Sequence, residues 1–540
     1  MPNRRLSTIP EQRAMEESVE DASPGHGRDG TLTATSLFYL VIIIVIGIPV
    51  WIKTTAPVRY SLPDVAALMV HAQMMVNHVP VTVIVRNGED YDQTSDIERE
   101  LSNQWPRKVS TDGAMSFTFD WKVRTSTKRE NDILNLSPNI STMDNLLSEM
   151  ETTDGEIRVF LVHQKVLGTE RLLAGLSRSL FLPDSVNDDE SLAEKIFSGV
   201  EFLIEPSSGK SLLTSADPGK GKHVNSEHLI NPNISMWINF VVEDPLDGAK
   251  FQSSHLQEVH AIADTAVTWS NLNQLLNLRI RTQMIYYAID QVGIDSVLSK
   301  KPSSVPGERL IDTRNIHTLI NSIENRVVEP DNKQSFYLNV IVPSSKSSGP
   351  LLFWDDSGES RSNILLTAAK GGFLVWNEDH DFNLGFKLLL RRLIGLNQLI
   401  PKQLIRKDEF FADWELDSVK RSVCQKQILK SLSSLESIEK LLGKVSNIVI
   451  GQQVSQRMHE AVDLSHQAID CLASGQLAKA YDHSCKAFQL SESAFYDPSL
   501  LALLYFPDDQ KYAVYFPLFL PVSLPLLSSI YHLIRNARRA

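Results

Sequence analysis

Two uncharged, apolar stretches near the two ends of the chain constrain its fold more than any other feature. Between Asp29 and Lys53, and again over the residues that follow Lys511, no Asp, Glu, Lys or Arg occurs for 23 residues. A helix needs about 20 apolar residues to cross the hydrocarbon core of a bilayer. The sequence therefore predicts a membrane protein with two transmembrane helices, at residues 31–52 and 512–534.

Other interpretations of the two stretches fit less well. A cleaved signal peptide is the alternative for the first, but its apolar run "SLFYLVIIIVIGIPVWI" is longer than usual and no small-x-small cleavage site follows it. For the second, the alternatives are a buried core helix and a GPI-attachment signal. The basic end with Arg535, Arg538 and Arg539 argues against both.

Positive charge predicts the orientation of the two helices. The arginines that flank them on the outer sides are Arg4, Arg5, Arg13, Arg28, Arg535, Arg538 and Arg539. Lys and Arg accumulate on the cytosolic side of membrane proteins, so both termini are expected in the cytosol. Residues 53–511 are then lumenal or extracellular. The net charge of −12 also argues against a nucleic-acid partner.

Three sequons for N-glycosylation lie in this large segment, at Asn135, Asn139 and Asn233. Pro138 follows the first sequon directly and lowers the expected use of Asn135. We therefore expect glycosylation at Asn139 and Asn233 in preference to Asn135.

Composition divides the chain further. The expected parts are a disordered cytosolic tail at 1–30, a lumenal α/β (α+β) region of one or two domains at 53–380, a lumenal helical bundle at 381–506 and a short basic cytosolic tail at 535–540. Runs rich in β-branched and aromatic residues predict strands at 81–86, 114–125, 155–165, 201–206, 234–244, 335–343 and 363–377. Helices are expected within 62–76, 191–200, 255–298, 312–328, 383–400 and 414–495.

No catalytic motif of the H-E-x-x-H, G-x-S-x-G or G-x-G-x-x-G type occurs. A nucleophilic pair could use Cys485 with His483 or Cys471 with His466. Residues two apart on a helix face different sides, which leaves His483 poorly placed to accept the Cys485 proton. We predict structural roles for these cysteines and for Cys424, and no catalytic, cofactor-binding or metal-binding residue.

The second apolar stretch contains Pro517, Pro521 and Pro525, spaced so that they share one face of a helix. A proline has no N–H, so each leaves a carbonyl one turn earlier without its helical partner. In hydrocarbon such carbonyls must be satisfied by neighbouring helices, hydroxyls or water. The three prolines therefore predict a face that packs against other membrane helices.

The same region carries a family resemblance. The segment "SAFYDPSLLALLYFPDDQKYAVYFPLFLPVSLPLL" closely resembles the C-terminal signature of the PIG-S family, subunits of the GPI transamidase. "GIPVWIKTTAPVRYSLP" (47–63) and "LLGKVSNIVI" (441–450) are similar to further segments of that family. The match is close over about 435–530 and 45–65. Between these parts the resemblance lies in the order and length of the elements.

The resemblance implies a two-span protein of the endoplasmic-reticulum membrane with a large lumenal region. It implies a non-catalytic subunit that supports assembly and substrate presentation while glycosylphosphatidylinositol (GPI) is attached to the C-terminus of proproteins. The implied partners are PIG-K, which holds the catalytic cysteine and histidine, PIG-T, PIG-U and a metallopeptidase-like subunit. Two alternatives stay open: a stand-alone lumenal glycan- or lipid-modifying enzyme, and a doubly tethered lumenal binding protein.

Overall fold

The structure is a computed structural model that describes residues 41–55 and 60–502, apart from 87–90, 110–114, 138, 151–154, 168–171, 184–190, 206–232, 269–271, 273–274, 276, 290–297, 299–306, 327–334, 347–348, 356–359, 368–370, 378–381, 395, 397–410 and 445–449. It also describes Thr35, Pro517, Arg538, 38–39, 520–521, 523–531 and 534–535. The predicted cytosolic tail at 1–30 and parts of both predicted spans lie outside the described residues.

Six strands form the first sheet, in the spatial order β2-β3-β1-β4-β6-β5. They are β1 (Val76–Val85), β2 (Arg107–Val109), β3 (Ser116–Thr125), β4 (Ile157–Val162), β5 (Leu173–Ala174) and β6 (Ser179–Pro183). The four inner strands run parallel, whereas β2 and β5 at the edges are short and antiparallel.

Helices cover both faces of this sheet. They are α4 (Tyr91–Gln104), α5 (Lys128–Leu136), α6 (Ile140–Ser148), α7 (Gln164–Leu167) and α8 (Leu192–Ile204). Neighbouring strand residues alternate between two apolar clusters, with Val83 and Val159 in one and Ile84 and Phe160 in the other. Burial on both faces explains why β4 is apolar at every position except Arg158, as parallel strands usually are.

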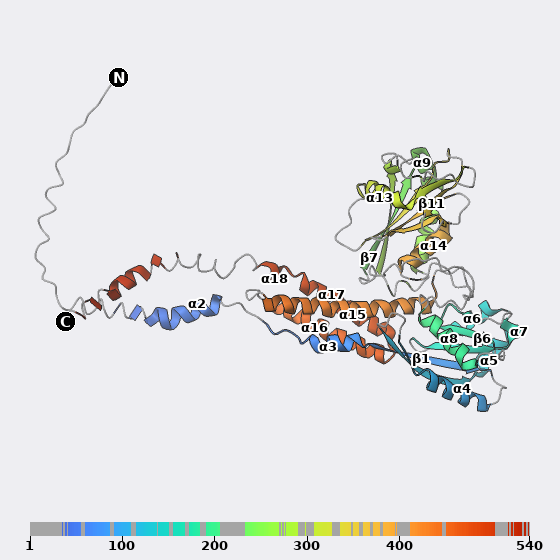
Figure 1. Cartoon of the computed structure of the whole chain (residues 1–540), viewed down its shortest axis with the longest axis horizontal. Coiled ribbons are helices and arrows are strands. Elements are labelled where there is room, and N and C mark those ends of the chain that lie inside the picture. The colour runs from blue at the N-terminus through green and yellow to red at the C-terminus, as the bar shows by residue number, and fades with distance from the viewer. Residues whose placement is uncertain are drawn as a thin grey trace, which may run out of the picture. The chain divides into compact units, whose positions relative to one another are not determined.

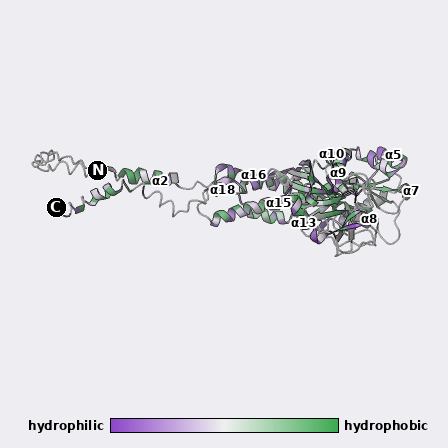
Figure 2. Cartoon of the chain, turned by 90° about the horizontal axis from the view of Figure 1, so that it is seen from above, coloured by the Kyte–Doolittle hydropathy of each residue, from purple (hydrophilic) through white to green (hydrophobic). Residues whose placement is uncertain are grey.

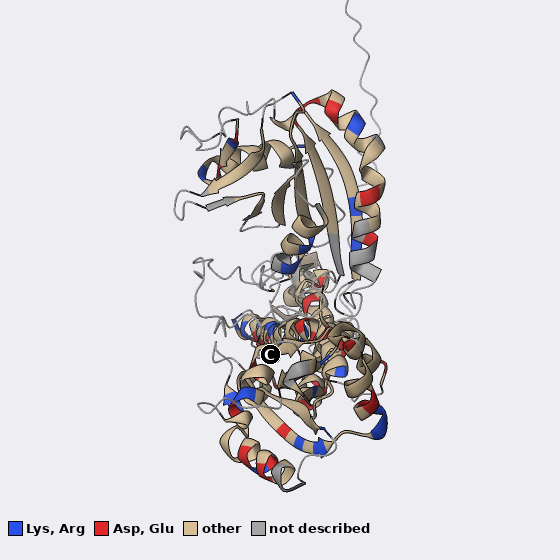
Figure 3. Ribbon diagram, turned by 90° about the vertical axis from the view of Figure 1, so that its right-hand side faces the viewer, with Lys and Arg blue, Asp and Glu red and all other residues tan. Residues whose placement is uncertain are grey.

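The second sheet has five strands in the order β13-β14-β10-β7-β8, and a three-stranded sheet, β12-β11-β9, accompanies it. The strands are β7 (Asn233–Val242), β8 (Asn277–Tyr286), β9 (Arg309–Asp312), β10 (Ser335–Val342), β11 (Leu351–Asp355), β12 (Ser360–Ser362), β13 (Ile364–Thr367) and β14 (Gly371–Val375). The helices of this region are α9 (Pro245–Ser254), α10 (Leu256–Thr268), η4 (Thr313–Asn315), α13 (Ile316–Glu324) and α14 (Phe382–Leu393). Figure 3 shows both sheets mostly in tan, with the charged residues mainly on helices.

The two sheets repeat one topology. In each, four parallel strands lie in the spatial order second-first-third-fourth: β3-β1-β4-β6 in the first sheet and β8-β7-β10-β14 in the second. In each, the fourth strand also pairs with the antiparallel strand that precedes it. This is the doubly wound arrangement. We call residues 62–205 the first lobe and 233–394 the second lobe; the β7 and β11 labels in Figure 1 mark the second.

Three long helices and the short α18 follow the second lobe in the described part of the chain. They are α15 (Asp413–Lys444), α16 (Gln452–Ala473), α17 (Leu477–Phe495) and α18 (Pro498–Ala502). The shorter α3 (Ala66–Gln73) precedes β1, and η1 (Ile43–Gly47) and α2 (Ile48–Thr55) precede α3. α15 contributes Leu416, Val419 and Val423 to the core of the second lobe. A mixed α/β region with a helical C-terminal part is therefore confirmed.

Two predictions of secondary structure are wrong. Residues 201–206 were predicted as a strand, but 201–204 are the last turn of α8, where Leu203 and Ile204 are buried. Residues 255–298 were predicted as helical, but 277–286 form strand β8. The alternating sequence "NLRIRTQMIY" has the two-residue period of a strand, and the preceding apolar helix α10 obscured it.

The chain divides into two compact units. Residues 1–61, 441–455 and 496–540 form one, and residues 62–440 and 456–495 form the other. Within the described parts of the chain, no helix has both the length and the apolar character needed to cross a membrane. Figure 2 shows α2 and the described C-terminal residues largely in green, the apolar end of its scale.

Candidate functional site

Doubly wound sheets bind ligands at the carboxyl ends of the strands, where the strand order reverses. In the second lobe this point lies between β7 and β10. Glu243 and Asp244 follow β7, and Ser344, Ser345 and Lys346 follow β10. Carboxylates therefore meet hydroxyl, amide and ammonium groups here.

Other residues of the chain form hydrogen bonds with both of these carboxylates and with Asp247 of α9. Arg309 donates to both oxygens of Glu243, at 2.7 and 3.1 Å. Lys346 Nζ donates to Asp244 at 2.6 Å. The backbone N–H and the hydroxyl of Ser345 both donate to Asp247, at 2.8 Å each. The switch point is thus closed by its own side chains.

Hydrogen bonds stabilise the ionised forms of the Asp244 and Asp247 carboxyls. A hydrogen bond from Lys346 lowers the pKa of the Asp244 carboxyl, and the backbone hydrogen bond from Ser345 lowers that of Asp247. No group of three or more His, Cys, Asp or Glu side chains that could hold a metal ion occurs among the described residues. The cluster joins two loops, and its Ser345 hydroxyl and Lys346 ammonium are hydrogen-bonded to carboxylates.

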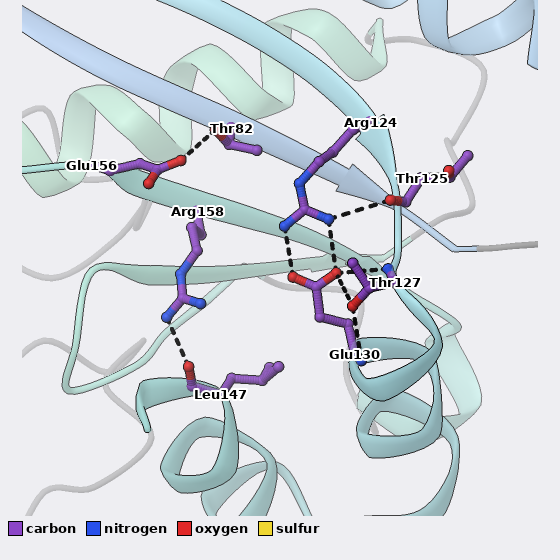
Figure 4. A network of polar contacts seen from close by, with 8 residues as sticks. All are labelled: Thr82, Arg124, Thr125, Thr127, Glu130, Leu147, Glu156 and Arg158. Carbon is purple, nitrogen blue, oxygen red and sulfur yellow. Dashed lines mark hydrogen bonds and ion pairs between the residues drawn. The ribbon is translucent and has the colours of Figure 1, made fainter. Parts of the chain in front are cut away.

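A second polar network lies in the first lobe (Figure 4). Arg124, near the end of β3, donates to both oxygens of Glu130 on α5, at 2.7 and 2.6 Å. Thr127 and Glu130 form a reciprocal capping box at the start of α5. Burial alone would raise the pKa of the Glu130 carboxyl, but the bonds from Arg124 and Thr127 lower it to about 2. The network fixes α5 against the sheet.

Arg158 on β4 belongs to the same region (Figure 4). Its Nη2 donates to the carbonyl of Leu147 at 2.8 Å, and its guanidinium lies 5.7 Å from the Phe160 ring centroid. Burial lowers the pKa of Arg158. Nearby, Thr82 donates to Glu156 at 2.5 Å. Arg158 and Thr82 are paired neighbours on adjacent strands.

The start of α15 is the third candidate, and we call it the α15 junction. It consists of Asp413, Trp414, Glu415 and Asp417 with the groups they bind. Toward the first lobe, the Asp413 N–H donates to the carbonyl of Leu176 at 2.7 Å, and Trp414 Nε1 donates to the carbonyl of Gly175 at 2.9 Å. Arg178 forms two hydrogen bonds with the Asp417 carboxylate.

The same helical turn binds the second lobe. Arg391 of α14 and Glu415 form a two-bond ion pair, and each side chain is 1% exposed. Glu415 also accepts a hydrogen bond from the backbone N–H of Ala412 at 3.0 Å. On α17, the Tyr481 hydroxyl donates to the carbonyl of Leu275. The α15 junction therefore holds both lobes to the helices.

Gly175 is required for this contact. A Cβ atom at this position would lie 2.0 Å from Asp144 Oδ1 and 2.2 Å from Ser179 Oγ. Asp144 is itself buried and accepts hydrogen bonds from Ser179 and from the Leu176 N–H. The turn between β5 and β6 can approach Asp144 and Trp414 closely only because residue 175 has no side chain.

The three cysteines carry free thiols, and Cys424 and Cys485 are buried. Burial raises the pKa of the Cys424 thiol to about 12, and it also raises those of Cys485 and Cys471. Cys485 lies within hydrogen-bond distance of Gln427. His466 Nδ1 contacts Asp470, at 2.9 Å. A thiol with a raised pKa is a poor nucleophile at neutral pH.

The residues predicted for glycosylation and for membrane packing lie on different elements. Asn135 is exposed near the end of α5, and Asn139 is exposed as the N-cap of α6. Asn233 is the first residue of β7. Pro517, Pro521 and Pro525 are exposed on the chain described here.

The α15 junction was not predicted from the sequence. Its signal lies in "DWELDSVKRSV", where charged residues alternate with the apolar positions of a helix. The apolar spacing predicted a helix here but gave no sign that its charged side chains are inside: Glu415, Asp417, Lys420 and Arg421 are all buried. The partners lie up to 239 residues away along the chain, which no local pattern reveals.

Fold and site together define a class of protein: two doubly wound lobes attached to long helices, with buried polar groups that join the parts. The family model described as "Phosphatidylinositol-glycan biosynthesis class S protein", PIG-S, matches residues 38–540. The chain therefore belongs to the PIG-S family.

Individual proteins show the same similarity. The chain is 28% identical to the GPI-anchor transamidase component PIGS of Bos taurus over 555 residues, with 94% of this chain and 95% of that protein covered. It is 27% identical to the component of the same name in Homo sapiens, with the same coverage. The GPI transamidase component GPI17 of Saccharomyces cerevisiae is 29% identical over 127 residues, which cover 22% of this chain and 24% of that protein.

Proposed function

We propose that the chain is a non-catalytic subunit of a GPI transamidase, which supports assembly of the complex and presentation of its substrates. The observation that carries the proposal is the family match over residues 38–540. Relatives named as transamidase components align along nearly their whole length. The proposed partners are PIG-K, PIG-T, PIG-U and a metallopeptidase-like subunit.

The chemistry of the described residues supports a role without catalysis. The polar groups at the switch point bind one another, and those at the α15 junction hold the lobes to the helices. Buried thiols with raised pKa values are unsuited to nucleophilic attack. In this proposal the cysteine and histidine that perform the transfer belong to PIG-K.

The proposed location is the endoplasmic-reticulum membrane. Two helices at 31–52 and 512–534 anchor the chain, both termini are cytosolic, and the lobes and long helices between them are lumenal. The two uncharged 23-residue intervals and the arginines outside them support this topology.

Mild-detergent purification of the tagged full-length chain tests the subunit role. We expect the other transamidase subunits to be recovered with it, and the chain to restore surface display of GPI-anchored proteins in cells that lack their own PIG-S. An unrelated two-span protein of the same membrane with the same tag serves as the control. Recovery of no subunit, or transfer of GPI by the purified chain alone, would overturn the proposal.

A further inference from the structure

The duplicated topology allows the two lobes to be compared position by position. β1 and β7 each have ten residues, and each pairs end to end with a ten-residue parallel neighbour, β3 or β8. The fifth residue is Pro80 in β1 and Trp237 in β7. The fourth residues, Val79 and Met236, each pack in a cluster with the helix that follows the strand, α4 or α10. The fifth residues, Pro80 and Trp237, therefore both point to the opposite side of their sheet.

On this side the second sheet carries a polar patch. We call it the Trp237 patch; it consists of Trp237, Asn239, Arg281, Gln283 and Asn339. Trp237 pairs with Arg281, and Asn239 pairs with both Gln283 and Asn339, so the five are immediate neighbours on three strands. Among the described residues, Trp237 belongs to neither apolar cluster that flanks the sheet.

Three polar atoms of the patch are buried without a hydrogen-bond partner: Trp237 Nε1, Asn239 Oδ1 and Gln283 Nε2. Trp237 is 7% exposed and Asn239 is fully buried. Asn239 Nδ2 donates to Asn339 Oδ1 at 2.8 Å, which leaves its own oxygen as the unpaired atom. Buried polar groups are nearly always paired, so two donors and one acceptor together indicate a missing partner.

In the first lobe the corresponding face is closed by another part of the chain. The turn between α16 and α17 rests on it: a Cβ atom on Gly475 would lie 3.3 Å from His78 and 3.7 Å from Pro80, and one on Gly155 would lie 3.4 Å from the Gly475 carbonyl. Gly475 has a φ of +79°. A tight peptide turn therefore covers the position that corresponds to Trp237.

The second lobe has a different cover at that position. The Arg281 guanidinium lies 5.2 Å from the Trp237 ring centroid, and the Arg281 side chain is exposed. Among the described strands, β8 is the edge of the second sheet, so the patch lies next to that edge. Arg279, two residues earlier on the same face, is exposed as well. The cover over the Trp237 ring is therefore a single exposed side chain.

We propose that the Trp237 patch is a docking site for a peptide turn of a neighbouring transamidase subunit. A peptide offers both carbonyls and N–H groups, as the unpaired atoms require: carbonyls accept from Trp237 Nε1 and Gln283 Nε2, and an N–H donates to Asn239 Oδ1. Arg279 and Arg281 at the rim favour an acidic segment. The inference rests on the proposed function, because the partner is another subunit of that complex.

A peptide fits the patch better than a glycan. Sugars stack on open aromatic faces, whereas the Trp237 ring is nearly buried and has a guanidinium over it. The first lobe shows that this face of the shared fold accepts a peptide turn. A peptide turn is therefore also the expected cover for the corresponding face of the second lobe.

The variant that tests this carries Trp237→Phe and Gln283→Met, which remove both unpaired donors and keep apolar bulk. We expect recovery of the partner subunits to fall about tenfold, because two hydrogen bonds across the contact are lost. The full-length variant expressed without its partners should melt at the wild-type temperature or above it. No internal hydrogen bond is lost, a phenyl ring still offers an aromatic face to the Arg281 guanidinium, and two unpaired polar groups are removed.

Trp121→Phe is the matched control in the first lobe. Trp121 is 4% exposed, and its Nε1 donates to the carbonyl of Trp105 at 3.0 Å. Loss of this internal bond should lower the melting temperature of the chain alone. Recovery of the subunits should fall only as far as the loss of folded protein explains.

The outcomes separate the two proposals. If the wild-type chain recovers no subunits, the proposed function fails and the docking site fails with it. If the wild type recovers them and the double variant does so equally well, only the docking site is refuted. A lower melting temperature of the double variant alone would show internal partners and also refute it. Normal subunit recovery with weakened binding of GPI in detergent would replace the peptide by a glycan.

Discussion

At the scale of single residues, the ionised groups of this protein mainly secure neighbouring elements. Glu130 shows how: it caps α5, pairs with Arg124 and is 1% exposed. Its pKa is lowered from 4.5 to about 2. A carboxyl whose pKa is lower in the folded state stabilises the fold above its unfolded pKa. That stabilisation is lost as the pH falls from about 4.5 to about 2.

Glu130→Gln should therefore lower the free energy of unfolding at pH 7 by about 2 kcal/mol. The difference from wild type should shrink progressively below pH 4.5. Proteolysis after brief exposure to a series of urea concentrations measures the free energy of unfolding of the full-length chain, at pH 7 and at lower pH. Glu149→Gln, at an exposed helix end, is the control and should change the free energy by less than about 0.5 kcal/mol. Equal effects of both substitutions would contradict this account.

The cysteines give a second prediction at this scale. With a maleimide at pH 8, Cys471 should be modified in the native chain, because it is the one cysteine with partial exposure. Cys424 and Cys485 should react only after unfolding, since burial keeps both thiols protonated and covered. Mass spectrometry of the peptides measures each rate.

The same chemistry predicts that the cysteines are dispensable for transfer. A chain with all three cysteines changed to Ala should restore surface display of GPI-anchored proteins at equal expression and with an intact complex. Loss of display under those conditions would assign a thiol a chemical role.

At the scale of elements, the sequence predicted what is local and missed what is distant. The strands at 114–125 and 335–343 are confirmed, because β-branched and aromatic residues between turn residues give a local signal. The α15 junction was not predicted, because its contacts join Trp414 to Gly175 and Glu415 to Arg391 through tertiary packing. Only a fold that places these segments together reveals the site.

The buried ion pair of the α15 junction should behave asymmetrically. Glu415→Gln leaves the Arg391 charge buried and should destabilise the chain by about 3 kcal/mol. Replacing both residues by Leu should cost much less, because no charge then remains inside. The exposed pair of Arg99 and Asp96, each 71% exposed, is the control, and its removal should change the free energy by less than about 0.5 kcal/mol. Urea-dependent proteolysis measures the free energy of unfolding of all three variants and of the wild type.

The prolines near the C-terminus make a further prediction at this scale. Changing Pro517, Pro521 and Pro525 to Leu restores three backbone N–H groups and raises hydrophobicity, so membrane insertion should persist. A face shaped to fit neighbouring helices would lose that fit. Recovery of the other subunits should therefore fall in mild detergent. Wild-type recovery at equal expression would show that the segment serves as an anchor only.

At the scale of the whole molecule, the duplicated lobes were not predicted. β1, "VNHVPVTVIV", and β7, "NISMWINFVV", share a length and a fully buried second half but few residues. The correspondence appears only in the strand order and register. A fold of this kind tolerates wide changes of sequence as long as most of both faces of each sheet stays apolar, so two lobes of the same topology can share few residues.

Topology is the prediction that belongs to this scale. If residues 53–511 are lumenal, Asn139 should carry a glycan. It is exposed, and its Oδ1 caps α6 by accepting from the Thr142 N–H at 2.8 Å, which leaves Nδ2 for the sugar. Endoglycosidase treatment of microsomes should shift the band, and Asn139→Gln should shorten that shift by one glycan. Asn135→Gln is the matched control and should leave the shift nearly unchanged, because Pro138 follows its sequon. A tag placed after Ala540 should be digested from outside sealed vesicles, because arginines beyond the predicted second span favour the cytosolic side of the membrane. Protection of this tag, or a band that endoglycosidase leaves in place, would refute the two-span arrangement.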